Sequence, residues 1–140
     1  MNTIIIRAVF FMKNDAGEDC AVLVRNITPD GDWYSAPGGE MRSGEALTER
    51  LVELIREQCG VIITPKEILF DEKTGEFMDM YFLCEHVSGE FAPIHEEEIL
   101  RTKTNRVPGT STPELVPLAQ VKHLYLLPPK LKEYLRKMDR

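Results

Sequence analysis

Apolar residues fall in short runs over the first forty positions, which is the pattern of strands. The run at 3–12 is rich in Ile, Val and Phe, and Cys20–Arg25 reads CAVLVR, so we predict a strand in each. Turn residues at Asn14–Gly17 separate the two runs and predict a hairpin. Pro29–Gly31 indicates another turn, and the stretch from Trp33 to Gly39 cannot be helical.

Residues 46–58 have the period of an amphipathic helix. Four large apolar residues recur at i, i+4, i+7 and i+8 and share one helical face: Leu47, Leu51, Leu54 and Ile55. Gly60 follows directly and supplies a stop signal.

The second half of the chain predicts further strands and one helix. We expect strands at 61–64, 67–70, 77–85, 89–91 and 115–118. Residues 93–114 are polar and contain Pro and Gly, so we expect a long loop there. Pro128 and Pro129 begin a helix over 129–138. With no internal repeat, this order of elements predicts one α/β domain over residues 1–140.

Composition narrows the class of protein. A chain of 140 residues with 43% hydrophobic residues can form one core. The net charge of -6 disfavours binding to duplex nucleic acid, although a metal ion could neutralise a free nucleotide. The sequence lacks the roughly 20 consecutive apolar residues of a membrane span. Three scattered cysteines without metal spacing predict reduced thiols in a cytoplasmic protein: Cys20, Cys59 and Cys84.

The segment Pro37–Val61 contains the candidate chemistry. Pro37 is followed by two glycines, which let the backbone approach a ligand closely, and a loop then leads to a helix N-terminus that favours anions. The helix region has glutamates spaced by four: Glu45, Glu49, Glu53 and Glu57. Magnesium would relieve their repulsion, because hard cations take carboxylate oxygens. The alternative is a solvated acidic face, in which Arg50 pairs with Glu53 or Glu57, and Arg56 with Glu53.

Loop and helix together resemble the Nudix box. That box begins with a Gly, and a Glu follows after five intervening residues. Seven further residues separate this Glu from an Arg-Glu pair. The box then ends with an aliphatic residue, any residue, Glu-Glu, any residue, Gly and an aliphatic residue. The matching positions are Gly39, Glu45, Ile55, Glu57, Gly60 and Val61. Trp33, the strand end Leu23-Val24-Arg25, and the tail Pro117-Leu118 with Leu126–Pro128 also fit. The resemblance implies an α/β (α+β) fold: an α/β/α sandwich whose mixed sheet is flanked by the box helix and a C-terminal helix.

The departures from the box fall on positions that the family uses for metal. Leu54 and Gln58 stand where the family has glutamate ligands, and Glu53 stands where it has an arginine that pairs with the glutamate matching Glu45. Leucine cannot bind a metal, and glutamine is a weak ligand for a hard dication. Two explanations of Leu54 stay open: it completes the apolar helix face, or the metal site is relocated towards Glu53.

The resemblance still implies a set of site residues. The metal ligands would be the Gly38 carbonyl, Glu57, Gln58 and, from the later loop, Glu97. Glu57 and Glu53 are the catalytic candidates. Substrate binding falls to Arg25, Gly39, Glu45 and Arg106, the arginines meeting a diphosphate. Each residue outside the box has the plain alternative of an ordinary surface charge.

The implied function is hydrolysis of a diphosphate linkage in a nucleoside diphosphate derivative, with Mg²⁺ or Mn²⁺ as cofactor. Loss of two helix carboxylates predicts a slow enzyme. The alternative is a catalytically inactive module on the same fold that binds a nucleotide or a protein. The expected partner is a small-molecule nucleotide derivative, without duplex nucleic acid or membrane. Substrate identity and oligomeric state stay open, with a homodimer as one option because dimers are common in the family.

Overall fold

The computed structural model describes the backbone of residues 3–41, 44–101 and 106–139, and the side chains within these ranges except at 97–101 and 106–107. The chain divides into two compact units, each assembled from separate segments. The first comprises Met1–Phe11 and Ala36–Ala92, and the second comprises Met12–Ser35 and Pro93–Arg140. That residues 1–140 behave as one domain stays a prediction.

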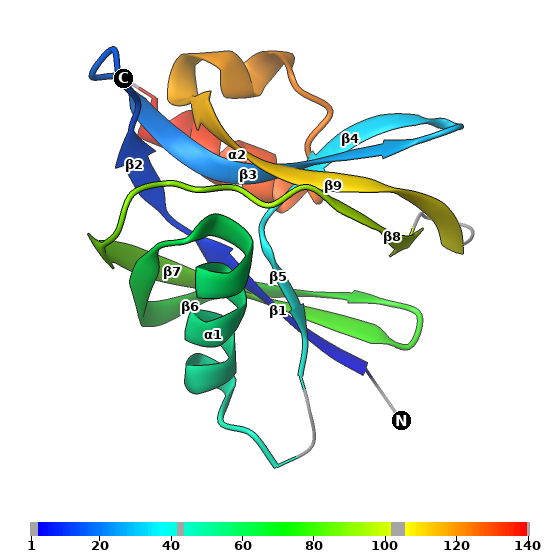
Figure 1. Ribbon diagram of the computed structural model, residues 1–140. Coiled ribbons are helices and arrows are strands. Elements are labelled where there is room, and N and C mark those ends of the chain that lie inside the picture. Colours follow the sequence, from blue (N-terminus) through cyan, green and yellow to red (C-terminus); the bar gives the residue numbers. More distant parts are fainter. Residues whose placement is uncertain (1–2, 42–43, 102–105, 140) are drawn as a thin grey trace. The chain divides into compact units, whose positions relative to one another are not determined.

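The first unit contains a mixed sheet of four strands in the order β5-β1-β7-β6 (Figure 1). These strands are Gly38–Glu40, Thr3–Val9, Phe77–Ser88 and Ile62–Thr74. Strand β1 is parallel to β7 and antiparallel to β5, and β6 is antiparallel to β7. Because β1 lies inside the sheet, its apolar run is nearly continuous, and Ile6 and Ala8 are fully buried.

Helix α1, Leu47–Cys59, contacts β1, β5 and β6 of the same unit. Its buried apolar residues are Leu51, Leu54, Ile55 and Cys59, close to the face predicted from the sequence. Gly60 ends the helix in the left-handed conformation at φ 75°, and its N–H donates to the Arg56 carbonyl. The predicted helix and its stop are confirmed.

The second unit contains a five-stranded sheet in which β2, β3, β9 and β8 follow one another and β4 pairs with β3 (Figure 1). These strands are Phe11–Lys13, Asp19–Thr28, Arg106–Pro117, Glu96–Arg101 and Gly31–Ser35. A 3-10 helix, η1, spans Leu118–His123, and helix α2 spans Pro129–Met138. Helix α2 confirms the prediction for 129–138 and contacts η1, with Leu131 and Leu135 buried.

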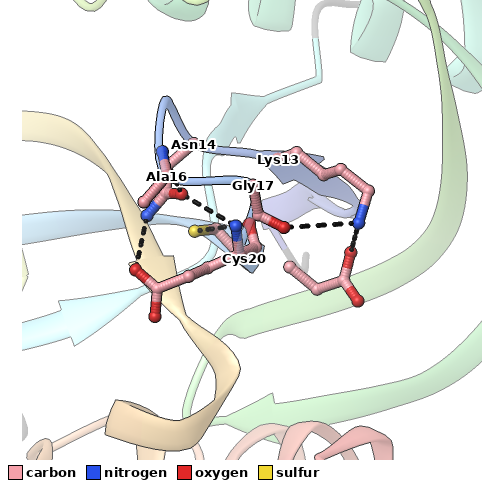
Figure 2. Close-up of polar contacts among 7 residues, drawn as sticks. Lys13, Asn14, Ala16, Gly17 and Cys20 are labelled. Atoms are coloured by element: carbon pink, nitrogen blue, oxygen red, sulfur yellow. Dashed lines mark hydrogen bonds and ion pairs between the residues drawn. The ribbon is translucent and has the colours of Figure 1, made fainter.

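The turn between β2 and β3 is held by its own polar groups (Figure 2). The Asn14 side-chain oxygen accepts hydrogen bonds from the backbone N–H groups of Ala16 and Glu18 at 3.1 and 2.9 Å. The Gly17 N–H donates to the Asn14 carbonyl at 2.9 Å. This confirms the predicted turn, because Asn side chains stabilise tight turns in this way.

The predicted hairpin is only partly right. The apolar run at 3–12 is not one strand: β1 pairs in the first unit, and the short β2 alone pairs with β3 in the second. A run of apolar residues does not indicate which sheet each part of it joins. The division between Val9 and Phe11 could therefore not be predicted from the sequence.

Three other expectations differ from the structure. The expected loop at 93–114 contains β8 and most of β9, which pair antiparallel from Glu96 opposite Ser111 to Arg101 opposite Arg106. Pro108, Gly109 and Pro113 suggested a loop, yet the long pairing of β9 with β3 outweighs these strand breakers. The segments at 61–64 and 67–70 form one strand, β6, with a register shift between Pro65 and Glu67, and residues 89–91 are not in a strand.

The expected α+β class, with a mixed sheet and two helices, is confirmed. Within the described residues, neither α-helix has the length and apolar character needed to cross a membrane.

Candidate functional site

Strand β5 lies against β1 so closely that its first residue must be glycine. Gly38 has a φ of +154°, and a Cβ atom placed on it would lie 1.9 Å from the Ile6 carbonyl oxygen. The register pairs Gly38 with Arg7 and Gly39 with Ile6, and the Ala8 N–H donates to the Pro37 carbonyl at 2.9 Å. The glycines that suggested close approach to a ligand therefore serve close approaches within the chain: Gly38 to the backbone of β1, and Gly39 to the Leu54 side chain of α1.

A buried ion pair fixes the entry to this strand. Arg7 Nε donates to Asp79 Oδ2 at 3.2 Å, and Arg7 Nη1 donates to the Ala36 carbonyl at 2.9 Å. Asp79 is only 4% exposed. This pair was not predicted from the sequence, although a signal was present: one basic and one acidic residue, each in the middle of an apolar run, suggest partners inside a sheet.

Three residues of α1 face β5 in order, and we call them the helix row: Arg50, Leu54 and Gln58. They are spaced by four, so they lie along one side of the helix. Gln58 Nε2 donates to the Gly38 carbonyl at 2.8 Å. Leu54 covers Gly39, whose Cβ position would lie 3.1 Å from the Leu54 Cδ2 atom. Arg50 Nε donates to the Glu40 carbonyl at 3.4 Å.

Arg50 also pairs with one of the helix glutamates, Glu53. Its guanidinium, in a side chain 7% exposed, donates to Glu53 Oε1 at 2.7 Å. This confirms one of the pairings that the solvated-face alternative offered. The arginine that contacts β5 thus stands about one helical turn before the position where the family box has its arginine.

The positions beside Gly38 do not fit a dication. The Gly38 oxygen accepts from an amide nitrogen, so Gln58 presents the positive end of its dipole where a cation would bring positive charge. Leu54 is 6% exposed and apolar, which agrees with the explanation that it completes the helix face. Within the described residues, no group of three His, Cys, Asp or Glu side chains could hold a metal ion.

Glu57 is the helix ligand position that keeps a carboxylate. It is exposed on α1, and the described part of the chain gives its side chain no hydrogen bond or ion pair. Glu53 is held by Arg50 and therefore less available for catalysis. Glu45 is half-buried just before α1, and Gly39 lies under Leu54.

The other candidates lie in the second unit. Arg25, exposed on β3, donates to Asp32 Oδ2 at 2.9 Å, and this hydrogen bond raises the pKa of its guanidinium. Glu97 lies on β8 opposite Thr110, and Arg106 lies on β9 opposite Arg101. The side chains of Glu97 and Arg106 fall outside the described residues, so their proposed roles stay predictions.

The chain resembles known proteins in sequence and in structure. No family model matches it. It is similar to 8-oxo-dGDP phosphatase NUDT18 of Homo sapiens, with 24% identity over 135 residues, and it spans 94% of its own length but only 40% of that relative.

Solved structures are similar over most of the chain. A NUDIX hydrolase from Nitrosomonas europaea matches 98% of this chain and 87% of its own, with a TM-score of 0.64 and 16% identity. An ADP-ribose pyrophosphatase from Streptococcus suis 89-1591 matches 85% of this chain and 76% of its own, with a TM-score of 0.55 and 19% identity. From this likeness, and from the strand, bend and helix of the box segment, we conclude that the chain has the fold of the Nudix hydrolases.

Proposed function

We propose that the chain is a slow hydrolase of the Nudix type, which cleaves a diphosphate linkage in a nucleoside diphosphate derivative. The observation that carries the proposal is the exposed carboxylate of Glu57, on a helix that follows strand β5, Gly38–Glu40, in a Nudix fold. The similar proteins support the substrate class, since one is an 8-oxo-dGDP phosphatase and another is an ADP-ribose pyrophosphatase.

The proposal is compatible with the poor fit for a cation beside Gly38. Magnesium in nucleotide enzymes is commonly held by one or two carboxylates together with the substrate phosphates, and there it neutralises the phosphate oxygens and helps to activate water. Glu57 can meet a magnesium diphosphate substrate or orient the attacking water. Glu53 could join it only after leaving Arg50, and Glu97 is proposed as a further acidic group. Arg25 and Arg106 are proposed to bind phosphate, with Gly39 and Glu45 shaping the loop.

A second candidate is a binding module without hydrolysis. The hydrogen bond from Gln58 to the Gly38 carbonyl favours it, because this contact occupies a family ligand position with an amide. Fold alone does not decide between the two candidates. A cytoplasmic location and a homodimer stay predictions.

Phosphate release from a panel of nucleotide sugars, dinucleotides, ADP-ribose and oxidised nucleotides tests the proposal. With Mg²⁺ or Mn²⁺ we expect slow turnover of at least one compound, and a loss of about a hundredfold or more in Glu57→Gln. Glu49→Gln is the matched control, because Glu49 is also exposed on α1. The hydrolase proposal fails if the wild type turns over none of the panel, or if Glu57→Gln is as active as the wild type. Chelator-insensitive binding without turnover would support the binding module.

A further inference from the structure

The contacts between α1 and β5 raise the question of what holds the box together. In the resemblance, the Gly38 carbonyl and the residue at position 58 are both cation ligands, so a bound ion would link β5 to the helix. Here the two positions meet directly, at 2.8 Å between Gln58 Nε2 and the Gly38 oxygen. A carbonyl oxygen only accepts hydrogen bonds, which fixes the amide nitrogen as the atom that faces it.

The neighbouring contacts of the helix row have the same effect. Leu54 packs on Gly39, and Arg50 donates to the Glu40 carbonyl, so each residue of β5 is contacted by one member of the row. Arg50 also supplies a buried positive charge next to Glu53, at 2.7 Å. Strand β5 is therefore attached to the helix at three points, all made by side chains of α1.

We propose that the helix row replaces a resident cation as the link between the Gly38–Glu40 strand and α1, so that the box assembles without metal. Gln58 is the member that stands directly in the place of the ion. A glutamate there would set a carboxylate against a carbonyl oxygen, and two acceptors repel unless a cation lies between them. Gln58→Glu should thus make the assembly of the box depend on metal.

The test measures the melting temperature of the full chain in chelator and with millimolar MgCl2 or MnCl2. For the wild type we expect no change between these conditions. For Gln58→Glu we expect a melting temperature several degrees lower in chelator, which the metal raises back towards the wild-type value. Gln120→Glu is the matched control, because it places the same new charge at an exposed residue of η1, and it should respond to neither condition.

Three results would overturn the proposal: a wild-type melting temperature that rises with metal alone, a Gln58→Glu variant as stable in chelator as the wild type, or a destabilised Gln58→Glu that metal does not restore. If Gln58→Glu does not fold, the melting temperature of Gln58→Met tests the proposal instead. Gln58→Met should melt below Gln120→Met at every metal concentration, and equal melting temperatures would exclude the link.

These melting temperatures are independent of turnover. A chain that hydrolyses nothing but shows the expected shifts refutes only the hydrolase proposal. A chain that hydrolyses its substrate but is stabilised by metal alone refutes only the replacement of the cation.

Discussion

Gly38 is the residue at which the backbone of β5 comes closest to β1. Its positive φ is strained for any other residue, and a Cβ atom would overlap the Ile6 carbonyl oxygen. We expect Gly38→Ala to lower the free energy of unfolding by about 3 kcal/mol or more. Denaturant titration measures this.

The control for Gly38 is Gly75→Ala, in the turn between β6 and β7. Gly75 also has a positive φ, of 60°, but a Cβ atom there would meet nothing within 4 Å. The expected loss is the conformational part alone, about 1 kcal/mol. Equal losses in the two variants would mean that the contact with β1 is unimportant.

The Arg7–Asp79 pair is a second contact that depends on single residues. Asp79→Ala leaves the Arg7 guanidinium without its carboxylate in a largely buried position. We expect a loss of about 3 kcal/mol in the free energy of unfolding, because removing one partner of a buried pair leaves the other charge buried without compensation. Urea unfolding followed by circular dichroism measures it.

Asp19→Ala is the matched variant for an exposed pair. Asp19 accepts from Lys13 at 2.9 Å, but both side chains are about two-thirds exposed, and such pairs contribute less than about 1 kcal/mol. A small effect at Asp79 as well would contradict a structural role for the Arg7 pair.

At the scale of elements, helix α1 stabilises the first unit in two ways. One face buries Leu51 and Ile55, and the helix row contacts β5. We expect Arg50→Ala to reduce the free energy of unfolding by about 2 kcal/mol, because Glu53 loses its partner and the Glu40 carbonyl loses a donor. Arg56→Ala, at an exposed position of the same helix, should change it by no more than about 0.5 kcal/mol. Equal effects in the two variants, measured by thermal unfolding, would exclude Arg50 as an anchor of β5 to α1.

Helices and turns were predictable because their signals are local. The helical spacing of the apolar residues identified α1. The turn at Asn14–Gly17 was predictable because the Asn14 side chain itself bonds to the backbone of the turn. Strand pairing was less predictable. Within the expected loop, residues 96–101 and 106–114 form strands because β9 pairs with β3 on one side and with β8 on the other. The β3 partner lies more than eighty positions away in the sequence, so local residue types do not indicate the pairing.

At the scale of the whole molecule, all three cysteines are buried free thiols. Burial raises the pKa of Cys59 and of Cys84 to about 12, from 9.0. We expect no reaction with a thiol reagent in the native chain at pH 8, and reaction of all three thiols after unfolding in denaturant, because the thiolate is the reactive form. A thiol that reacts rapidly in the native chain would contradict this.

The same shifts predict how stability depends on pH. The folded state keeps these thiols protonated while the unfolded state loses their protons above about pH 9. The contribution of the two thiols to the free energy of unfolding is therefore complete below pH 9, and it is lost as the pH rises towards about 12. The midpoint of denaturant unfolding should fall over that window, and fall less in a variant with both Cys59→Ala and Cys84→Ala. An identical fall in both proteins would rule out the thiols as its cause.

The sequence by itself determined the fold class, the box segment and its departures at Leu54 and Gln58, because these follow from residue types at fixed local spacings. Only the tertiary structure decided that Gln58 donates to Gly38, twenty positions away, and that Arg7 pairs with Asp79, seventy-two positions away. The physical reason is that a side chain's hydrogen-bond partner is set by where distant segments pack, and spacing along the chain carries no information about that.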